Sequence, residues 1–428
     1  MKTKIFIFLS LFILVIINSC MDEYTEEFTA NSPVYMAYDD LRDAVKRTTS
    51  RELVNPGKIY FKDGYIFINE SLKGVHIINN TDPRNPQNIG FIEIPGNADI
   101  AIKENTLYAD SYIDLVAIDI SNLNNIREVS RIEKVFPYTT PPIDDDYPMA
   151  KVDEEKGVVL EWEIKKVRQK MEYQYYPVYY FARAEMDMAT NSAGVFGGSQ
   201  SGSTFGVGGS MARFGLYKDY LYTVDNNTLY MFDVKIPATP TSLGSQGVGW
   251  QVETMFIYDN HMFFGTTTGM EIFNLDVPTV PKYVTRFWHA TSCDPVVISN
   301  GYAYITLRGG RTCNNNNINR LDVVKLSSDY KTNTLIASYG MSGPYGLGID
   351  GQTLFVCDGD AGLKIYDVTD KSHVDSNMLA RFTNINTYDV IPFNKYLFMV
   401  GKDGFYQYDY SNLKNIYQVS FIPVKKEK

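Results

Sequence analysis

Short segments in which apolar and polar residues alternate recur about every 40 residues along the chain. The clearest of them is DLVAID at 114–119. Further copies are KGVHII at 73–78, NTLYMFD at 227–233, GMEIFN at 269–274, NRLDVV at 319–324, GLKIYD at 362–367 and GFYQYD at 404–409. Alternation with a period of two predicts half-buried strands. A strand-based repeat of this length predicts propeller blades or solenoid turns.

The first repeat unit, Pro56 to Ile94, contains four predicted strands joined by turn residues such as Lys62-Asp-Gly64. Four antiparallel strands in about 40 residues are typical of a propeller blade. The later units begin near Gly96, Met211, Trp250, Ser292, Gly343 and Asn386. The chain is therefore predicted to be all-β, with a seven-bladed β-propeller over 56–424. A solenoid is the alternative, but it would need capping turns that the terminal units lack.

Two segments fall outside the repeat. Residues 136–210 separate the second and third units as a long insertion, in which 157–168 is predicted to be a strand and the glycine-rich 194–209 to be flexible. Residues 33–55 are predicted to hold a short N-terminal helix, because Ser32 and Pro33 precede apolar residues at helical spacing.

The N-terminus predicts the cellular compartment. Lys2 and Lys4 precede an apolar run over 5–17, which is too short to span a membrane and is typical of a secretory signal peptide. The run ends in Ile-Ile-Asn-Ser-Cys20, which resembles the lipobox of bacterial lipoproteins. That resemblance implies a signal peptide over 1–19 and diacylation of Cys20, with palmitate among the expected chains. A soluble secreted protein is the alternative.

The segment after the cysteine is strongly acidic, with four carboxylates in residues 22–27, and is predicted to form a solvated tether over 20–32. It resembles the acidic signal that directs lipoproteins of Bacteroidota to the cell surface, so we expect a lipid anchor in the outer membrane, facing outward. The formal charge falls from −10 to −12 without Lys2 and Lys4, which argues against nucleic acid as a partner.

The repeats resemble those of the LVIVD-repeat lipoproteins of Bacteroidota. The similarity rests on DLVAID at 114–119, PGNADI at 95–100, SCDPVV at 292–297, PYGLG at 344–348 and DGFYQYD at 403–409. It implies a β-propeller at the cell surface and assigns no catalytic residue.

Aligning the units places charged residues at the start of the innermost strands and in the loops that return to the same end of the channel. The candidate binding mouth consists of Asp99, Arg213, Glu253, Asp294, Arg308, Tyr345, Asp358 and Asp389. Propellers bind ligands at such concave polar sites. Alternatively, the charges satisfy one another in a hydrated channel, since buried charges are paired whether or not a ligand binds. The insertion leaves the ring on the same face and is rich in tyrosine, which suits recognition of a partner.

We therefore expect a cell-surface lipoprotein that binds a protein or a glycan through its propeller. One alternative is a carbohydrate-active hydrolase or lyase that uses Asp99, Glu253, Asp294 or Asp389, although their spacing selects no acid–base pair. Another is an accessory subunit of an outer-membrane uptake or adhesion complex. The sequence favours binding over catalysis.

Cysteines and histidines indicate no metal or cofactor site. Cys293 and Cys313 are predicted to form a disulfide at the mouth, and Cys357 to be buried and free. The four histidines lie in separate units without metal-ligand spacing, and His76 is expected in the core.

Overall fold

The computed structural model describes residues 25–170, 207–208, 210–249, 251–289, 295–310 and 317–425. The chain divides into two compact units. The smaller contains residues 25–36 and 139–170 of the described chain, and the larger contains 37–138 and the described residues from 207 onward. Within these ranges, no helix is long and apolar enough to cross a membrane.

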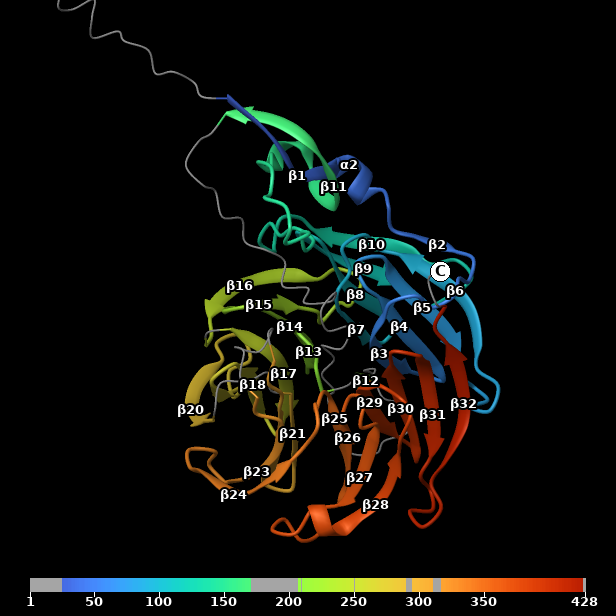
Figure 1. The fold of residues 1–428 in the computed structure, drawn as a ribbon, viewed down its shortest axis with the longest axis vertical. Helices are drawn as coiled ribbons and strands as arrows, with labels where there is room; N and C mark the ends of the chain where they lie inside the picture. The colour runs from blue at the N-terminus through green and yellow to red at the C-terminus, as the bar shows by residue number, and fades with distance from the viewer. Residues whose placement is uncertain are drawn as a thin grey trace, which may run out of the picture. The chain divides into compact units, whose positions relative to one another are not determined.

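The larger unit is a ring of seven antiparallel sheets, which confirms the seven-bladed propeller (Figure 1). Six blades have four strands each, and the first has two added strands. The blades are β3–β6 (Pro56–Lys62, Tyr65–Glu70, Gly74–Asn79, Gln87–Glu93), β7–β10 (Ile100–Lys103, Thr106–Ser111, Asp114–Asp119, Arg127–Ile132), β13–β16 (Phe214–Tyr217, Tyr220–Asp225, Thr228–Asp233, Thr241–Gly247), β17–β20 (Val252–Tyr258, His261–Thr266, Gly269–Asn274, Lys282–Trp288), β21–β24 (Val296–Ser299, Tyr302–Leu307, Arg320–Leu326, Asn333–Gly340), β25–β28 (Leu347–Asp350, Thr353–Cys357, Leu363–Asp367, Met378–Phe382) and β29–β32 (Thr387–Phe393, Tyr396–Gly401, Gly404–Asp409, Tyr417–Pro423). A 3-10 turn, Asp375–Asn377, precedes β28.

The repeated segments seen in the sequence are the third strands of the blades, and in four of them the aspartate that ends the strand forms the turn that follows. The carboxylate of Asp119 accepts a hydrogen bond from the N–H of Ser121 at 2.9 Å. The carboxylates of Asp233, Asp367 and Asp409 likewise accept a hydrogen bond from the N–H of the residue two positions later, each at 2.8 Å. Such a turn starts the loop toward the fourth strand, so the aspartate of the repeat has a local structural role.

Among the described strands, the ring closes by packing the last blade on the first, without exchange of a strand between them. Phe398 of β30 stacks on Phe61 of β3 at a ring-centroid distance of 5.1 Å. Both belong to an apolar cluster that also contains Ile59, Ile391 and Phe405. Beyond the last strand, Val424 forms a parallel bridge with Leu53. These contacts bring both ends of the propeller to one seam.

The short N-terminal helix is not confirmed. Residues 33–36 belong to strand β1, and the helical part is one turn, α2 (Tyr38–Arg42). Lys46–Thr48 then forms strand β2, which pairs with β6 on the outer edge of the first blade. The apolar spacing that predicted a helix reflects instead a chain that lies on the propeller, with Leu41 buried and Val45 against the core.

The smaller unit is built on a long two-stranded ribbon of β1 (Thr25–Met36) and β11 (Val158–Lys170). The strand predicted over 157–168 is therefore confirmed, whereas the predicted tether is a paired strand from residue 25 onward. A 3-10 turn, Glu154–Lys156, precedes β11. Asn31 is fully buried, and its side-chain amide donates to the carbonyls of Asp144 and Tyr147 at 2.9 and 2.7 Å. These bonds fix the N-terminal strand to the first part of the insertion.

Replacing Phe398 with alanine tests the seam. We expect the Phe398→Ala variant to lose about 3–5 kcal/mol of unfolding free energy, because the ring is buried between the first and last blades. Phe421→Ala, in the outer strand of the same blade, is the matched control, since Phe421 is 40% exposed. Denaturant unfolding measures both variants, and equal losses would contradict closure at this seam.

Candidate functional site

The candidate site is the end of the channel at which the innermost strands begin. We call it the charged mouth and define it by Asp99, Arg213, Glu253, Arg308, Tyr345, Asp358 and Asp389, the described members of the predicted set. Asp294 and the predicted disulfide between Cys293 and Cys313 lie outside the described residues. Glu253 and Arg213 are partly exposed, and the carboxylates of Asp99, Asp358 and Asp389 are buried.

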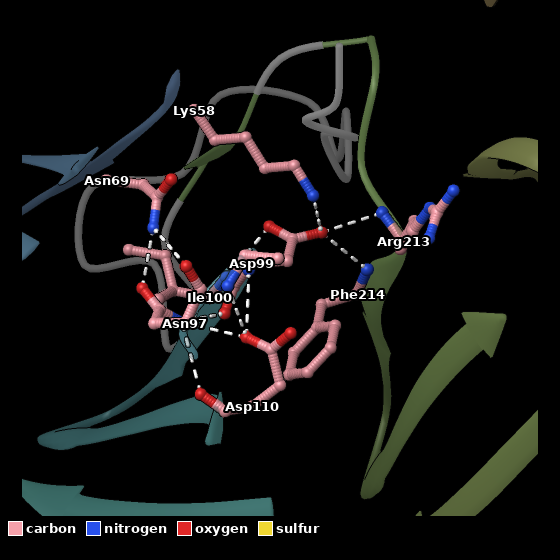
Figure 2. Close-up of polar contacts among 9 residues, drawn as sticks. Lys58, Asn69, Asn97, Asp99, Ile100, Asp110, Arg213 and Phe214 are labelled. Carbon is pink, nitrogen blue, oxygen red and sulfur yellow. Dashed lines mark hydrogen bonds and ion pairs between the residues drawn. The ribbon is translucent and has the colours of Figure 1, made fainter. Parts of the chain in front are cut away.

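Asp99 joins three blades (Figure 2). Its carboxylate forms an ion pair with Nζ of Lys58 in the first blade at 2.8 Å. The same oxygen accepts hydrogen bonds from the N–H groups of Arg213 and Phe214, at the head of the third blade, at 2.7 and 3.0 Å. Lys58 and Asp99 are 4% and 2% exposed, so the pair is removed from solvent. Asp99 is thus a link between inner strands.

A second buried layer supports Asp99 from below. Asp110 accepts hydrogen bonds from the N–H groups of Ala98 and Asp99 at 2.8 and 3.0 Å, and from the side chain of Asn97 at 2.8 Å. Asn97 in turn accepts a hydrogen bond from Asn69 of the first blade at 2.6 Å. Figure 2 shows these side chains converging on the head of β7. Side chains thus accept the hydrogen bonds of the backbone N–H groups of Ala98 and Asp99, which lead into strand β7.

Burial shifts the ionisation of this network. It lowers the pKa of Lys58 to about 8, with Asp99 opposing the shift, and it raises the pKa of Asp110. Both shifts follow from removing a charged form from water. Perturbed groups often mark catalytic sites, but structural ion pairs show the same behaviour. Here Lys58 is paired with Asp99, and Asp110 is bonded to backbone N–H groups of the chain itself.

The same use of a carboxylate recurs at the end of the second strand in two other blades. Glu70 accepts the N–H groups of Val54 and Asn55, and Asp358 accepts those of Ser342 and Gly343 at 2.9 and 2.8 Å. Asp358 also forms an ion pair with Lys364 of its own blade. In each case the acceptor caps the backbone that leads into the inner strand.

A cation–aromatic cluster occupies the mouth at the fifth to seventh blades. The guanidinium carbon of Arg308 lies 4.1 Å from the ring centroid of Tyr345, and that ring lies 5.6 Å from Tyr388. Arg308 and Tyr388 are each 7% exposed, whereas Tyr345 is partly exposed. Asp389 follows Tyr388 directly and lies against Gly346. A cation held over an aromatic face stabilises such a cluster by about 0.5–2 kcal/mol.

The structure therefore brings together some of the predicted residues and separates their roles. Asp99 meets the backbone of Arg213, and Arg308 meets Tyr345. Asp358 instead binds groups of its own blade. Sequence reasoning missed Asn97 and Tyr388; the only signal for Asn97 is its place beside Asp99 in the PGNAD segment.

The remaining candidate groups lie in the core. His76 is fully buried, and its Nε2 lies 2.9 Å from the carboxylate of Glu70. Cys357 is buried and free, as predicted, and burial raises the pKa of its thiol. No group of three or more histidine, cysteine, aspartate or glutamate residues in the described chain is placed to hold a metal ion.

Substituting Asp99 tests whether the mouth network is structural. We expect Asp99→Ala to lose about 3–5 kcal/mol of unfolding free energy, because Lys58 is left buried without its partner. Without Asp99 the folded-state pKa of Lys58 falls below 8, while its unfolded pKa stays higher. The unfolded state of the variant then binds more protons than its folded state, so the unfolding free energy of the variant rises with pH. The deficit relative to the wild type therefore shrinks as pH approaches about 8.

Adding Lys58→Met to Asp99→Ala should restore part of the lost stability and remove this pH dependence. Denaturant unfolding between about pH 6 and pH 9 measures both effects. Asp145→Ala, at an exposed position, is the control. A stability unchanged by Asp99→Ala would show that the carboxylate is free for another role.

Comparison with known proteins supports the repeat and the fold. The LVIVD repeat family model matches residues 95–133 and 346–376, the second and sixth blades. No curated protein matches the chain in sequence. A crystal structure of a protein from Lactobacillus plantarum is similar at 11% identity, with 86% of this chain and 96% of that chain covered and a TM-score of 0.51.

Two further solved structures are more distantly similar. Sqt1 of Saccharomyces cerevisiae has 8% identity and a TM-score of 0.49, and the match covers 92% of this chain and 89% of Sqt1. PorZ, a surface component of the type-IX secretion system of Porphyromonas gingivalis, has 10% identity and a TM-score of 0.46, and the match covers 89% of this chain and 40% of PorZ. At such identities the similarity concerns the fold alone: the chain is a β-propeller that carries LVIVD repeats.

Proposed function

We propose that the chain is a lipid-anchored binding module on the outer face of the outer membrane and performs no chemistry of its own. The observation that carries this proposal is the use of carboxylates at the charged mouth. Asp99, Asp110, Asp358 and Glu70 each accept backbone N–H groups that enter an inner strand. These bonds engage the carboxylates in capping inner strands, and Asp99 in addition links neighbouring blades.

The same bonds weaken the alternative of a glycan hydrolase. General acid–base catalysis needs a carboxyl group that reaches the scissile bond and exchanges a proton with it. Asp99 is 2% exposed, paired with Lys58 and bonded to two backbone amides. Protonating it would break this network, so it is poorly suited to act as an acid or a base.

A rigid frame with different loops at each blade is suited to recognition. Binding residues commonly lie on loops that a stable scaffold positions. At this mouth the frame is held by buried bonds, while Tyr345 and Arg213 remain partly exposed. The expected partner is a protein or a glycan, since the acidic chain disfavours nucleic acid.

The proposed anchor is supported by the sequence around Cys20. Strand β1 begins at Thr25, five residues after the cysteine. This arrangement supports a surface-anchored protein whose first strand starts close to the membrane.

Lipidation is tested by feeding cells an alkyne analogue of palmitate. The wild-type protein should be labelled, and Cys20→Ser should lose the label and leave the membrane fraction. Cys357→Ala is the control, because Cys357 is buried and should not be acylated. Protease added to intact cells should digest the wild-type protein. Label retained by Cys20→Ser would refute the anchor, and resistance of intact cells with digestion after lysis would refute outward exposure.

Recognition at the mouth is tested by photocrosslinking in living cells. Replacing Tyr345 with a photoreactive phenylalanine analogue should give a discrete adduct after illumination, since Tyr345 is partly exposed at the mouth. The same replacement at Tyr283, which is 57% exposed on the outer strand β20, is the matched control. An adduct at Tyr283 alone would place recognition elsewhere. Cleavage of any member of a glycan panel by the purified full-length protein would contradict a purely binding role.

A further inference from the structure

A strand of the chain itself lies in the centre of the propeller. The short strand β12 (Val207–Gly208) comes from the end of the insertion and pairs antiparallel with β3, with Val207 opposite Phe61 and Gly208 opposite Tyr60. Strand β3 is the innermost strand of the first blade. Because the other edge of β3 pairs with β4, its free edge faces the channel, and β12 occupies that edge.

The residues that follow β12 contact the inner strands of further blades. The hydroxyl of Ser210 accepts a hydrogen bond from the N–H of Leu347, in the sixth blade, at 2.8 Å. The carbonyl of Ala212 accepts one from the N–H of Met255, in the fourth blade, at 2.8 Å. The chain then reaches Arg213, whose N–H donates to Asp99 at the second blade. One short segment is thus bonded to inner strands on several sides of the ring.

The three residues at the end of this segment are buried. Ser210, Met211 and Ala212 are each 2% exposed. Met211 lies beside Gly346 of the sixth blade, where a β-carbon would stand 2.9 Å from its sulfur. Glycine at this position leaves room for the methionine, and small residues on either side let the backbone pass close to the inner strands.

We propose that residues 207–208 and 210–212 are a resident plug that closes the channel of the propeller. The plug takes the inner edge of β3, which would otherwise accept an extended peptide by strand addition. With the channel closed, the module does not take a small molecule into its centre. Its partner is then a macromolecule that contacts the loops around the mouth, and this part of the inference rests on the proposed binding function.

Hydrogen–deuterium exchange of the full-length protein tests whether the plug is resident. Peptides that span 207–214 should exchange as slowly as peptides from β3, because their amides are paired or buried. Exchange as fast as that of an unstructured peptide of the same sequence would overturn the proposal. Ser210→Ala should speed exchange at Leu347 by at least about tenfold, and Ser242→Ala, on the exposed strand β16, should leave it unchanged.

Replacing the methionine tests whether the plug fills the channel. Met211→Ala should lower the melting temperature by several degrees, since it leaves a cavity among inner strands. Met378→Ala is the matched control, because Met378 is 42% exposed on β28. Equal melting temperatures for Met211→Ala and wild type would overturn the plug.

The class of partner is tested by repeating the exchange experiment in the presence of mono- and oligosaccharides and comparing exchange at 207–214 with and without them. A saccharide that binds and alters exchange at 207–214 would overturn closure of the channel. Slow exchange that no saccharide alters supports it. Loss of the lipid anchor or of crosslinking at Tyr345 would refute the proposed function and leave the exchange of 207–214 as it is, so the two failures are distinguishable.

Discussion

The inner strands of the propeller begin together at one end of the channel, and the backbone donors that lead into them must find acceptors there. An unpaired amide in such a crowded place costs free energy comparable to a lost hydrogen bond. The chain meets this constraint with carboxylates: Asp110, Glu70 and Asp358 each cap the approach to an inner strand of their own blade. Asp99 extends the same solution to the next blade, where it accepts two amides.

This constraint decides how the charge of the mouth is interpreted. A ring of buried acidic and basic groups resembles a site poised for chemistry, and burial does shift the pKa of Lys58 and of Asp110. Yet every partner that the described network provides to these two groups is part of the scaffold. The free energy of the ion pair between Lys58 and Asp99 therefore contributes to joining blades. The proposed recognition would therefore fall to the partly exposed groups of the mouth, such as Tyr345, which lies over Arg308.

The sequence predicted the blades well because their signal is periodic and local. Alternation marks each strand, and the aspartate that ends the third strand makes its turn within two residues. The mouth was predicted only in part, since alignment of units shows which residues lie at an end of the channel but not what they bond. The N-terminal helix is not confirmed as predicted: the helical part is the single turn α2, and Val34 and Tyr35 pair with β11, more than 120 residues away. A helical spacing of apolar residues cannot reveal such a distant partner.

The end of the insertion shows how tertiary contacts add to what composition predicts. Glycine and serine predict flexibility when a chain is surrounded by solvent, because nothing offsets the entropy of ordering them. In the stretch 194–209 for which flexibility is predicted, Val207 and Gly208 pair with β3, and the other residues lie outside the described chain. Residues 210–212 follow directly and are buried, with hydrogen bonds to Leu347 and Met255. These partners belong to different blades, so the order of residues 210–212 is a consequence of the fold around them.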